Sequence, residues 1–365
     1  MNRRKFIKYT SLFSVGTAYL ANAESIDSLK AETAPISNID GLVIKNDEIA
    51  INREQNFTIP PLLAPGARIA FASPSSVTNL WEVSKAVTAF KNAGLEVEIG
   101  RIIKNQKNKF RYLAAPDEDR AKEFMEFVER PDIDAIISGR GGYGSMRIAD
   151  LLDFEKISRN PKIYIGFSDF TFLLNTISQK AKIITYHGPI GVSSFSEFSR
   201  NYLFKVILEN QPRSFSYTCP NAIQLVKGNC VGRIVGGNLT MLAASLGTKH
   251  EINTDEAILF FEDTNEQPYQ VDRMITQLKL AGKFDNIKGI IVGQFSKSSR
   301  RKAFYPNYSY TMVEVFEQLL SPIGVPTLLN VPIGHISEQI TMPINSIIEL
   351  NTTKKEINFL YKTSI

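Results

Sequence analysis

Short apolar runs alternate along residues 68–165 with longer stretches in which apolar positions recur every three or four residues. The short runs predict buried strands, and the longer stretches predict helices that cover them. Strands that alternate with helices in this way indicate a parallel, doubly wound α/β sheet. The expected strands are 68–73, 96–99, 135–137 and 162–165, and the expected helices are 80–93, 117–129 and 146–152.

This rhythm breaks at residues 191–227, a stretch with Ser, Phe and Asn, without clear periodicity, that predicts an interdomain connection. From about Val231 onward strands and helices alternate again, which predicts a second α/β domain. The chain then closes with two apolar strands around the turn Asn351–Lys354. The expected helices of this second block are 238–246 and 269–280, and the expected strands are 257–261 and 289–294.

The first 23 residues have the three zones of an export signal. Residues 3–8 are rich in Arg and Lys, residues 9–20 are largely apolar, and residues 21–23 form an Ala-Asn-Ala cleavage site. The Arg pair favours a twin-arginine signal, and an ordinary secretory signal is the alternative. We therefore expect a mature chain that begins near Glu24 and lies in a bacterial periplasm, with no membrane-spanning segment.

Charge excludes one further class of partner. The chain has a net charge of +5, but the first 23 residues hold four basic and no acidic side chains. The remainder therefore has 38 basic against 37 acidic residues, a net charge of +1. Nucleic-acid binding needs a concentrated cationic face, so we expect no nucleic-acid partner.

The cysteines and the spacing of possible metal ligands give no sign of a metal or disulfide-rich protein. The chain has two cysteines, Cys219 and Cys230, which in an exported protein are either a disulfide or two unpaired thiols. The sequence contains no HExxH, EF-hand, P-loop or His/Cys ligand spacing, so we expect neither a metal nor a cofactor.

The densest local motif is the glycine loop 139–144, followed by Ser145. The loop comes after an apolar strand and precedes a helix, and formally fits a dinucleotide-binding G-x-G-x-x-G pattern. A second interpretation makes Ser145 a nucleophile at a sharp strand-to-helix turn, where free backbone N–H groups stabilise an oxyanion. A third makes Ser145 a plain helix cap.

A serine nucleophile needs a histidine base and an acid that orients it. The three histidines are His187, His250 and His335. His250 lies in a polar stretch and is expected to be exposed, whereas His187 and His335 follow apolar strands at Gly/Pro turns. Glu262 and Asp263 end a buried-looking strand, where an acid can lie beside an imidazole. The alternative is that the two acids cap the helix that begins near Pro268.

Several motifs in register resemble those of the LD-carboxypeptidases and their microcin-immunity relatives, a serine peptidase family. They span about residues 66–350 in order. The matching runs are 139–145, 165–169, 187–189, 236–239 with 246–248, 261–263 with 268–269 and 272–278, and 332–335.

The resemblance implies Ser145 as nucleophile, Glu262 as the orienting acid and His335 as general base. It removes the dinucleotide interpretation, because the same glycines shape the nucleophile turn. The implied reaction releases terminal D-Ala from murein tetrapeptides by acyl transfer. The alternatives are a microcin-immunity hydrolase of peptide–nucleotide conjugates and a non-catalytic nucleotide-binding α/β protein.

The resemblance also implies a flavodoxin-like N-terminal domain, a smaller β-rich C-terminal domain, a substrate pocket between them and a homodimer. Pocket candidates are the N–H of Met146 as oxyanion donor, Arg140 as carboxylate ligand, and Gly142 and His187. The expected divisions are a signal peptide 1–23, an arm 24–65, a flavodoxin-like domain 66–190, a connection 191–230 and a C-terminal domain 231–365.

Overall fold

The computed structural model describes residues 43–45, 48–50, 57–105, 112–212, 214–296 and 309–360. The chain forms two compact units, Met1–Gln55 and Asn56–Ile365. In the first unit, β1 (Val43–Lys45) and β2 (Glu48–Ala50) pair as an antiparallel hairpin. The predicted signal peptide lies outside the described residues. The other described elements all belong to the second unit.

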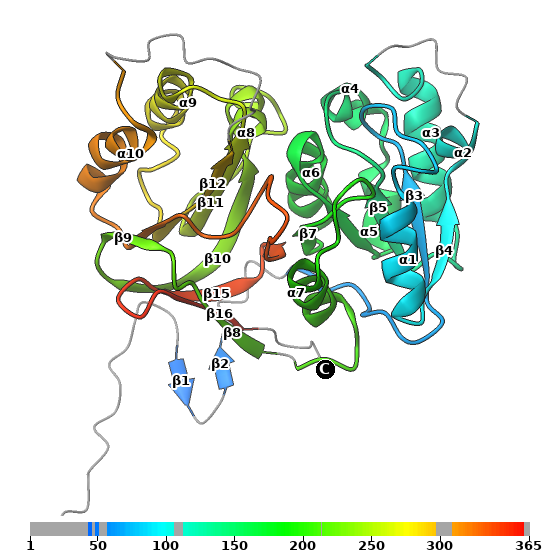
Figure 1. Cartoon of the computed structure of the whole chain (residues 1–365), viewed down its shortest axis with the longest axis horizontal. Helices are drawn as coiled ribbons and strands as arrows, with labels where there is room; N and C mark the ends of the chain where they lie inside the picture. Colours follow the sequence, from blue (N-terminus) through cyan, green and yellow to red (C-terminus); the bar gives the residue numbers. More distant parts are fainter. Residues whose placement is uncertain are drawn as a thin grey trace, which may run out of the picture. The chain divides into compact units, whose positions relative to one another are not determined.

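The first sheet of this unit has the strand order of flavodoxin (Figure 1). Five parallel strands are arranged as second, first, third, fourth and fifth in chain order, which confirms the predicted doubly wound fold. A sixth strand, β14 (Met342–Ile344), comes from the far end of the chain and pairs antiparallel with β7. The parallel strands are β3 (Arg68–Ala72), β4 (Glu96–Ile99), β5 (Ala135–Ser138), β6 (Ile163–Gly166) and β7 (Thr185–His187).

Helices cover both faces of this sheet because alternate strand residues point to opposite sides. Ile69 and Phe71 pack into one core with α1 and α7, whereas Ala70 and Ala72 pack into another with α3 to α6. The helical segments are α1 (Ser84–Asn92), α2 (Arg101–Lys104), α3 (Asp117–Glu129), α4 (Ser145–Ile148), η2 (Ala149–Leu151), α5 (Phe154–Arg159), η3 (Ser168–Phe170), α6 (Thr171–Ala181) and α7 (Glu197–Ile207).

The second sheet has eight strands in the described part of the chain, and four adjacent strands, the fourth to the seventh across the sheet, are parallel. In order across the sheet they are β8 (Ser214–Thr218), β16 (Glu356–Leu360), β15 (Ile347–Asn351), β10 (Asn229–Asn238), β11 (Ala257–Thr264), β12 (Gly289–Ser296), β13 (Thr327–Leu329) and β9 (Ile223–Val226). One face packs on α8 (Leu239–Ser245), α9 (Pro268–Leu280) and α10 (Met312–Leu320), which is followed by η4 (Ser321–Ile323).

The other face of the second sheet shares a core with the first sheet. Ile234, Ile258 and Phe260 belong to the same apolar cluster as Leu173 and Leu174 of α6. α6 therefore lies between the two sheets (Figure 1).

The predicted connection 191–230 contains regular structure. It holds α7 and the two edge strands of the second sheet, β8 and β9. In β8 the partly buried Phe215 and the buried Tyr217 alternate with exposed polar residues, a strand pattern that the surrounding Ser and Asn residues obscured. Cys219 and Cys230 are free thiols, and burial raises the pKa of each to about 12.

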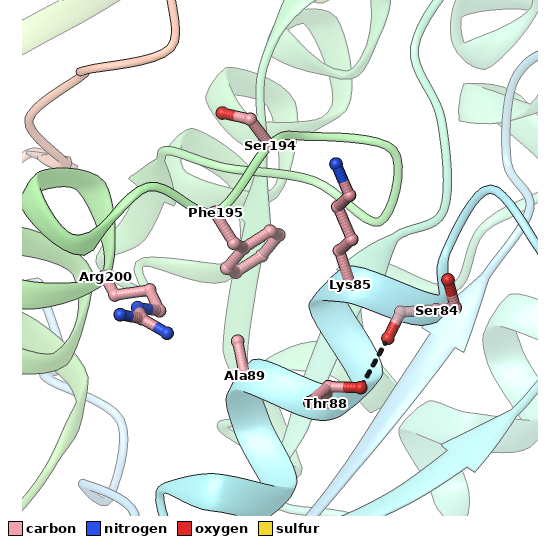
Figure 2. Close-up of a pocket in the computed structure, with 7 residues that line it drawn as sticks. All are labelled: Ser84, Lys85, Thr88, Ala89, Ser194, Phe195 and Arg200. Atoms are coloured by element: carbon pink, nitrogen blue, oxygen red, sulfur yellow. Dashed lines mark hydrogen bonds between the residues drawn. The ribbon is translucent and has the colours of Figure 1, made fainter.

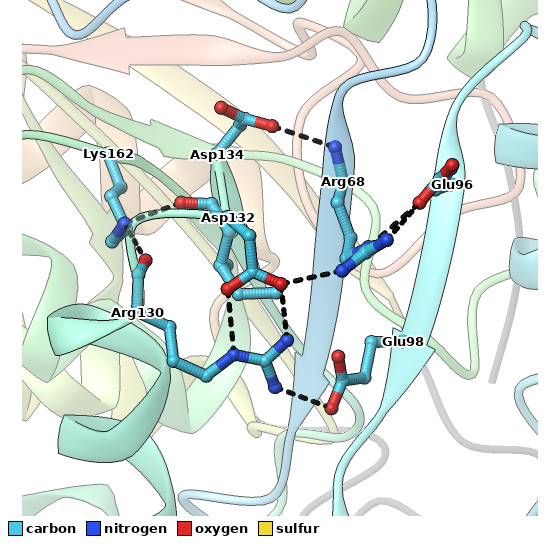
Figure 3. A network of polar contacts seen from close by, with 8 residues as sticks. Arg68, Glu96, Glu98, Arg130, Asp132, Asp134 and Lys162 are labelled. Carbon is cyan, nitrogen blue, oxygen red and sulfur yellow. Dashed lines mark hydrogen bonds and ion pairs between the residues drawn. The ribbon is translucent and has the colours of Figure 1, made fainter.

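Charged side chains join the amino ends of the strands in the first sheet (Figure 3). Arg68 at the start of β3 forms ion pairs with Glu96 and Asp132, at 2.5 and 2.6 Å. Arg130 binds the same Asp132 at 2.6 Å and Glu98 at 2.8 Å. Each of these side chains is 28–57% exposed, so water screens the attraction.

Candidate active site

The carboxyl ends of the parallel strands carry the chemically informative loops. In a doubly wound sheet this edge is where ligands bind. The glycine loop 139–144 follows β5, residues 167–168 follow β6, and residues 188–196 follow β7. Among the described helices none has the length and apolar composition to cross a membrane.

The glycine loop lies against the turn after β6. A Cβ atom added to Gly141 would lie 2.8 Å from the Cβ and 3.0 Å from the Oγ of Ser168, so only glycine allows this approach. Gly142 and Gly144 have φ angles of +92° and +127°, which L side chains rarely adopt. The loop therefore presents bare backbone to the hydroxyl of Ser168.

Ser145, the expected nucleophile, is fully buried at the first turn of α4. Its hydroxyl donates to the carbonyl oxygen of Asp169 at 2.6 Å, and its N–H donates to the Asp169 carboxylate at 2.8 Å. The N–H of Gly144 binds the same carboxylate at 3.2 Å. These surroundings differ from those expected of a nucleophile, because the hydroxyl is enclosed and already donates its proton to a carbonyl.

Ser168 stands at a sharp strand-to-helix turn, the setting that was expected for Ser145. β6 ends at Gly166, and two residues later Ser168 turns the chain into η3 and α6 with a φ of +60°. A non-glycine residue in this region is strained by about 1–3 kcal/mol, and such strain gathers at functional sites. A sharp strand-to-helix turn of this kind exposes a serine hydroxyl in the nucleophile elbow of hydrolases. The half-buried Ser168 fits that description.

A sequence signal for this turn was present in Gly166-x-Ser168 at the end of an apolar strand. A Cβ atom at Gly166 would lie 2.1 Å from the ring of Phe170, so the turn depends on glycine there. The run 165–169 was matched only as a family motif, and its serine was not among the expected nucleophiles.

Glu262 and His335 form the predicted pair. Glu262 projects from β11 and is fully buried, and its Oε2 lies 2.7 Å from Nδ1 of His335. A Cβ atom at Gly334, whose φ is +107°, would lie 2.2 Å from the same carboxylate oxygen. Glycine before His335 therefore lets the histidine loop close over the acid.

The pair holds Glu262 ionised. Burial alone would raise the pKa of Glu262, but attraction to His335 and His187 and the hydrogen bond with His335 lower it to about 2. Burial would likewise lower the pKa of His335, but the charge and hydrogen bond of Glu262 outweigh it and raise this pKa. His335 is therefore a stronger base than a free imidazole.

His187 backs the pair instead of lining an open pocket. It is fully buried, with Nε2 3.7 Å from the second carboxylate oxygen of Glu262. Its ring packs edge-on against Phe167 and Phe260. Within the described chain neither ring nitrogen has a hydrogen-bond partner.

Phe167 connects the serine turn to the histidine. It precedes Ser168, and its ring lies 4.8 Å from the ring of His335, centre to centre. No hydrogen bond links His335 to Ser168 or to Ser145 in the part of the chain that the structure describes. Catalytic hydrogen bonds are often long without substrate and tighten when it binds.

The remaining pocket candidates have other surroundings. Arg140 forms an ion pair with Glu82 at 3.0 Å, and the partly buried Met146 packs on the apolar core beside Ser145. Gly142 faces Ser76. His250, expected to be exposed, is buried with its Nε2 2.8 Å from Asp150, so that expectation was wrong.

Comparison with known proteins covers both halves of the chain. Residues 69–188 match the family model described as the LD-carboxypeptidase N-terminal domain, and residues 231–350 match that of the C-terminal domain. A Bacillus subtilis protein named "Probable murein peptide carboxypeptidase" is 34% identical over 303 residues, or 81% of this chain and 92% of that protein. The Microcin C7 self-immunity protein MccF of Escherichia coli is 30% identical over 336 residues, covering 81% and 94%.

Solved structures agree with these matches. MccF in complex with glutamyl sulfamoyl guanosine has a TM-score of 0.75 at 27% identity, covering 83% of this chain and 98% of that one. The muramoyltetrapeptide carboxypeptidase from Oxalobacter formigenes has a TM-score of 0.69 at 28% identity, covering 80% and 97%. Fold and matches together define a two-domain α/β peptidase. The chain belongs to the LD-carboxypeptidase family.

Proposed function

We propose that the protein is a serine-type murein LD-carboxypeptidase that releases terminal D-Ala from tetrapeptide stems, with Ser168 as nucleophile. The observation that carries this proposal is the strained Ser168 turn, packed against the glycine loop and joined through Phe167 to the Glu262–His335 pair. The relative named for murein peptides supports this substrate class. We assign the nucleophile to Ser168 and not to Ser145, because the hydroxyl of Ser145 is fully buried.

The mechanism follows from the roles of these groups. Nδ1–H of His335 donates to Glu262, which leaves Nε2 free to accept the Ser168 proton as Oγ attacks the scissile carbonyl carbon. The C–N bond then breaks, and His335 returns the proton to the departing amine of D-Ala. Water, deprotonated by the same His335, hydrolyses the acyl-enzyme and restores Ser168.

The oxyanion of each tetrahedral intermediate needs backbone donors. The N–H of the residue after the nucleophile, here Asp169, supplies one in nucleophile elbows. The glycine loop supplies the second, because Gly141 lies against the Ser168 side chain. This assignment moves the first donor from Met146, which follows Ser145, to Asp169. Losing one such donor typically costs about 10²–10³ in rate.

Incubation with a defined tetrapeptide stem, followed by mass measurement, tests the proposal. The wild-type protein should remove one alanine, and Ser168→Ala should remove none while keeping its fold. No mass change with the wild-type protein would contradict the murein activity.

The similarity to MccF supports a second candidate substrate, a peptide–nucleotide conjugate. The one tryptophan of the chain, Trp81, is 83% exposed and precedes α1, away from Ser168 in the sequence. Parallel assays with a tetrapeptide stem and an aminoacyl sulfamoyl adenosine would separate the two activities.

We also propose export to the periplasm by residues 1–23, and a homodimer. Cell fractionation with and without the Arg3→Lys and Arg4→Lys substitutions tests the export route. Light scattering of the purified mature chain tests the homodimer.

A further inference from the structure

A cavity of about 290 Å³ lies outside the serine, glutamate and histidine cluster (Figure 2). Its walls come from three segments: α1, the loop 193–196 and α7. Lys85 projects from α1 and Arg200 from α7, and Phe195 lies between them in the view of Figure 2. Nothing in the proposed mechanism uses these residues.

The cavity holds two cations and no acid among its lining residues. In the described chain neither Lys85 nor Arg200 has an ion pair or a side-chain hydrogen bond. Glu82, one helical turn before Lys85, is already paired with Arg140 at 3.0 Å. Lys85 is exposed and Arg200 is half-buried, and both line the same cavity. Two such cations without a counter-charge favour an anion in the cavity, and a guanidinium binds carboxylates through paired hydrogen bonds.

The backbone at the cavity is strained. Phe195 has a φ of +50° although it is not glycine, and its ring is held against Phe90 at 5.5 Å between centres. A bulky residue in this region is a backbone outlier that the surrounding structure must maintain. The strain fixes one wall of the cavity beside the two cations.

Hydrogen bonds connect the cavity loop to both parts of the active site. The hydroxyls of Ser196 and Ser199 donate to the carbonyl of Ser337, two residues after His335, each at 2.8 Å. On the other side the N–H groups of Gly191 and Val192 donate to the carbonyls of residues 138 and 139, where the glycine loop begins. An anion in the cavity would therefore lie beside the loops that carry the reaction.

We propose that Lys85 and Arg200 form an anion subsite that binds a carboxylate of the substrate peptide remote from the scissile bond. This inference rests on the proposed function, because murein stems carry free carboxylates on their acidic and diamino-acid residues. The subsite gives the enzyme selectivity for acidic stems over stems whose carboxylates are amidated. A free oxyanion offers the same chemistry and would occupy the same cavity.

Steady-state kinetics on matched stems test the subsite, one stem with a free side carboxylate and one with that carboxylate amidated. With the wild-type protein, amidation should raise KM about tenfold and leave kcat unchanged, because one charge-assisted hydrogen bond to the substrate is lost. Arg200→Gln and Lys85→Gln should raise KM for the acidic stem by a similar factor and leave KM for the amidated stem unchanged. The matched control is Lys91→Gln, an exposed lysine on α1 outside the cavity, which should change neither.

The subsite would be overturned if Arg200→Gln and Lys85→Gln raised KM equally for the acidic and the amidated stem. It would also be overturned if neither variant raised KM for the acidic stem. Thermal shift with inorganic phosphate separates this result from failure of the proposed function. If the wild-type protein cleaves neither stem, the murein activity fails, but phosphate should still stabilise the wild-type protein and not the Lys85→Gln/Arg200→Gln double variant. Equal stabilisation of both proteins, or of neither, would overturn the anion site itself.

Discussion

The two ends of the first sheet carry opposite kinds of polar chemistry. At the amino end, Arg68 and Arg130 are each paired with two carboxylates, and all of these groups are partly open to water. At the carboxyl end, Ser168 sits at positive φ, and His187 of β7 meets the fully buried Glu262, which comes from β11 of the second sheet and also contacts His335.

The difference shows that the charged groups that join the strand ends are separate from the groups proposed to carry out the reaction. An ion pair that is open to water costs little desolvation free energy and adds little to the free energy of unfolding. Such pairs can therefore join strand ends without fixing the geometry of other residues. A buried carboxylate and a strained serine are costly, and the rest of the fold must hold them in place. Substitutions at the two ends should therefore affect different measurements.

The largest effect is expected at the serine turn. Ser168→Ala should lower turnover by about 10⁴–10⁶, because the nucleophile is lost while the fold remains. Ser145→Ala is the matched comparison, since it removes one buried hydroxyl and leaves Ser168 in place. Tetrapeptide hydrolysis measures both, and a reversal of their ranking would return the nucleophile to Ser145.

Glu262→Gln should lower turnover by about 10³–10⁴ with little change in KM. The amide cannot hold the His335 tautomer or stabilise the imidazolium that forms as Ser168 is deprotonated. Circular dichroism should match that of the wild-type protein. A variant within about tenfold of the wild-type rate would remove Glu262 from the mechanism.

The pH profile should show a tenfold fall per unit below its midpoint. His335 must be neutral to accept a proton, and Glu262 raises its pKa, so His335 stays protonated up to a higher pH. The midpoint should therefore lie above the value of about 6.5 for an unperturbed histidine. In Glu262→Gln the midpoint of the residual activity should move to lower pH, and an unchanged midpoint would show that another group titrates.

The smallest effect is expected at the amino end. Asp132→Asn removes the carboxylate that Arg68 and Arg130 share. Arg68 keeps its ion pair with Glu96, and Arg130 keeps its ion pair with Glu98. The melting temperature should fall by no more than about 2 °C, because these ion pairs are screened by water. kcat/KM should stay within about twofold, and a larger loss would mean that the two ends of the sheet are coupled.

The fold was more predictable than the nucleophile. Strands such as 135–137 are bounded by Gly and Pro and are apolar throughout, so their pattern shows in the sequence alone. The contact between Glu262 and His335 also agrees with the pairing that the motif positions implied. Ser145 and Ser168 both stand between an apolar strand and a helix, and the proposal of Ser168 rests on its positive φ and on the contact of Ser145 with Asp169. Neither a backbone angle nor a contact across 24 residues is visible in local pattern.

Strand β14 has a consequence for how the chain folds during synthesis. It pairs with β7 along Thr185–His187, so that edge of the first sheet stays uncovered until residues 342–344 leave the ribosome. At roughly 5–20 residues per second, the roughly 160 residues in between take about 8–30 s to be made. An uncovered strand edge is a template for wrong pairing. The nascent chain is therefore exposed to aggregation at this edge until residues 342–344 have been made and have paired with β7.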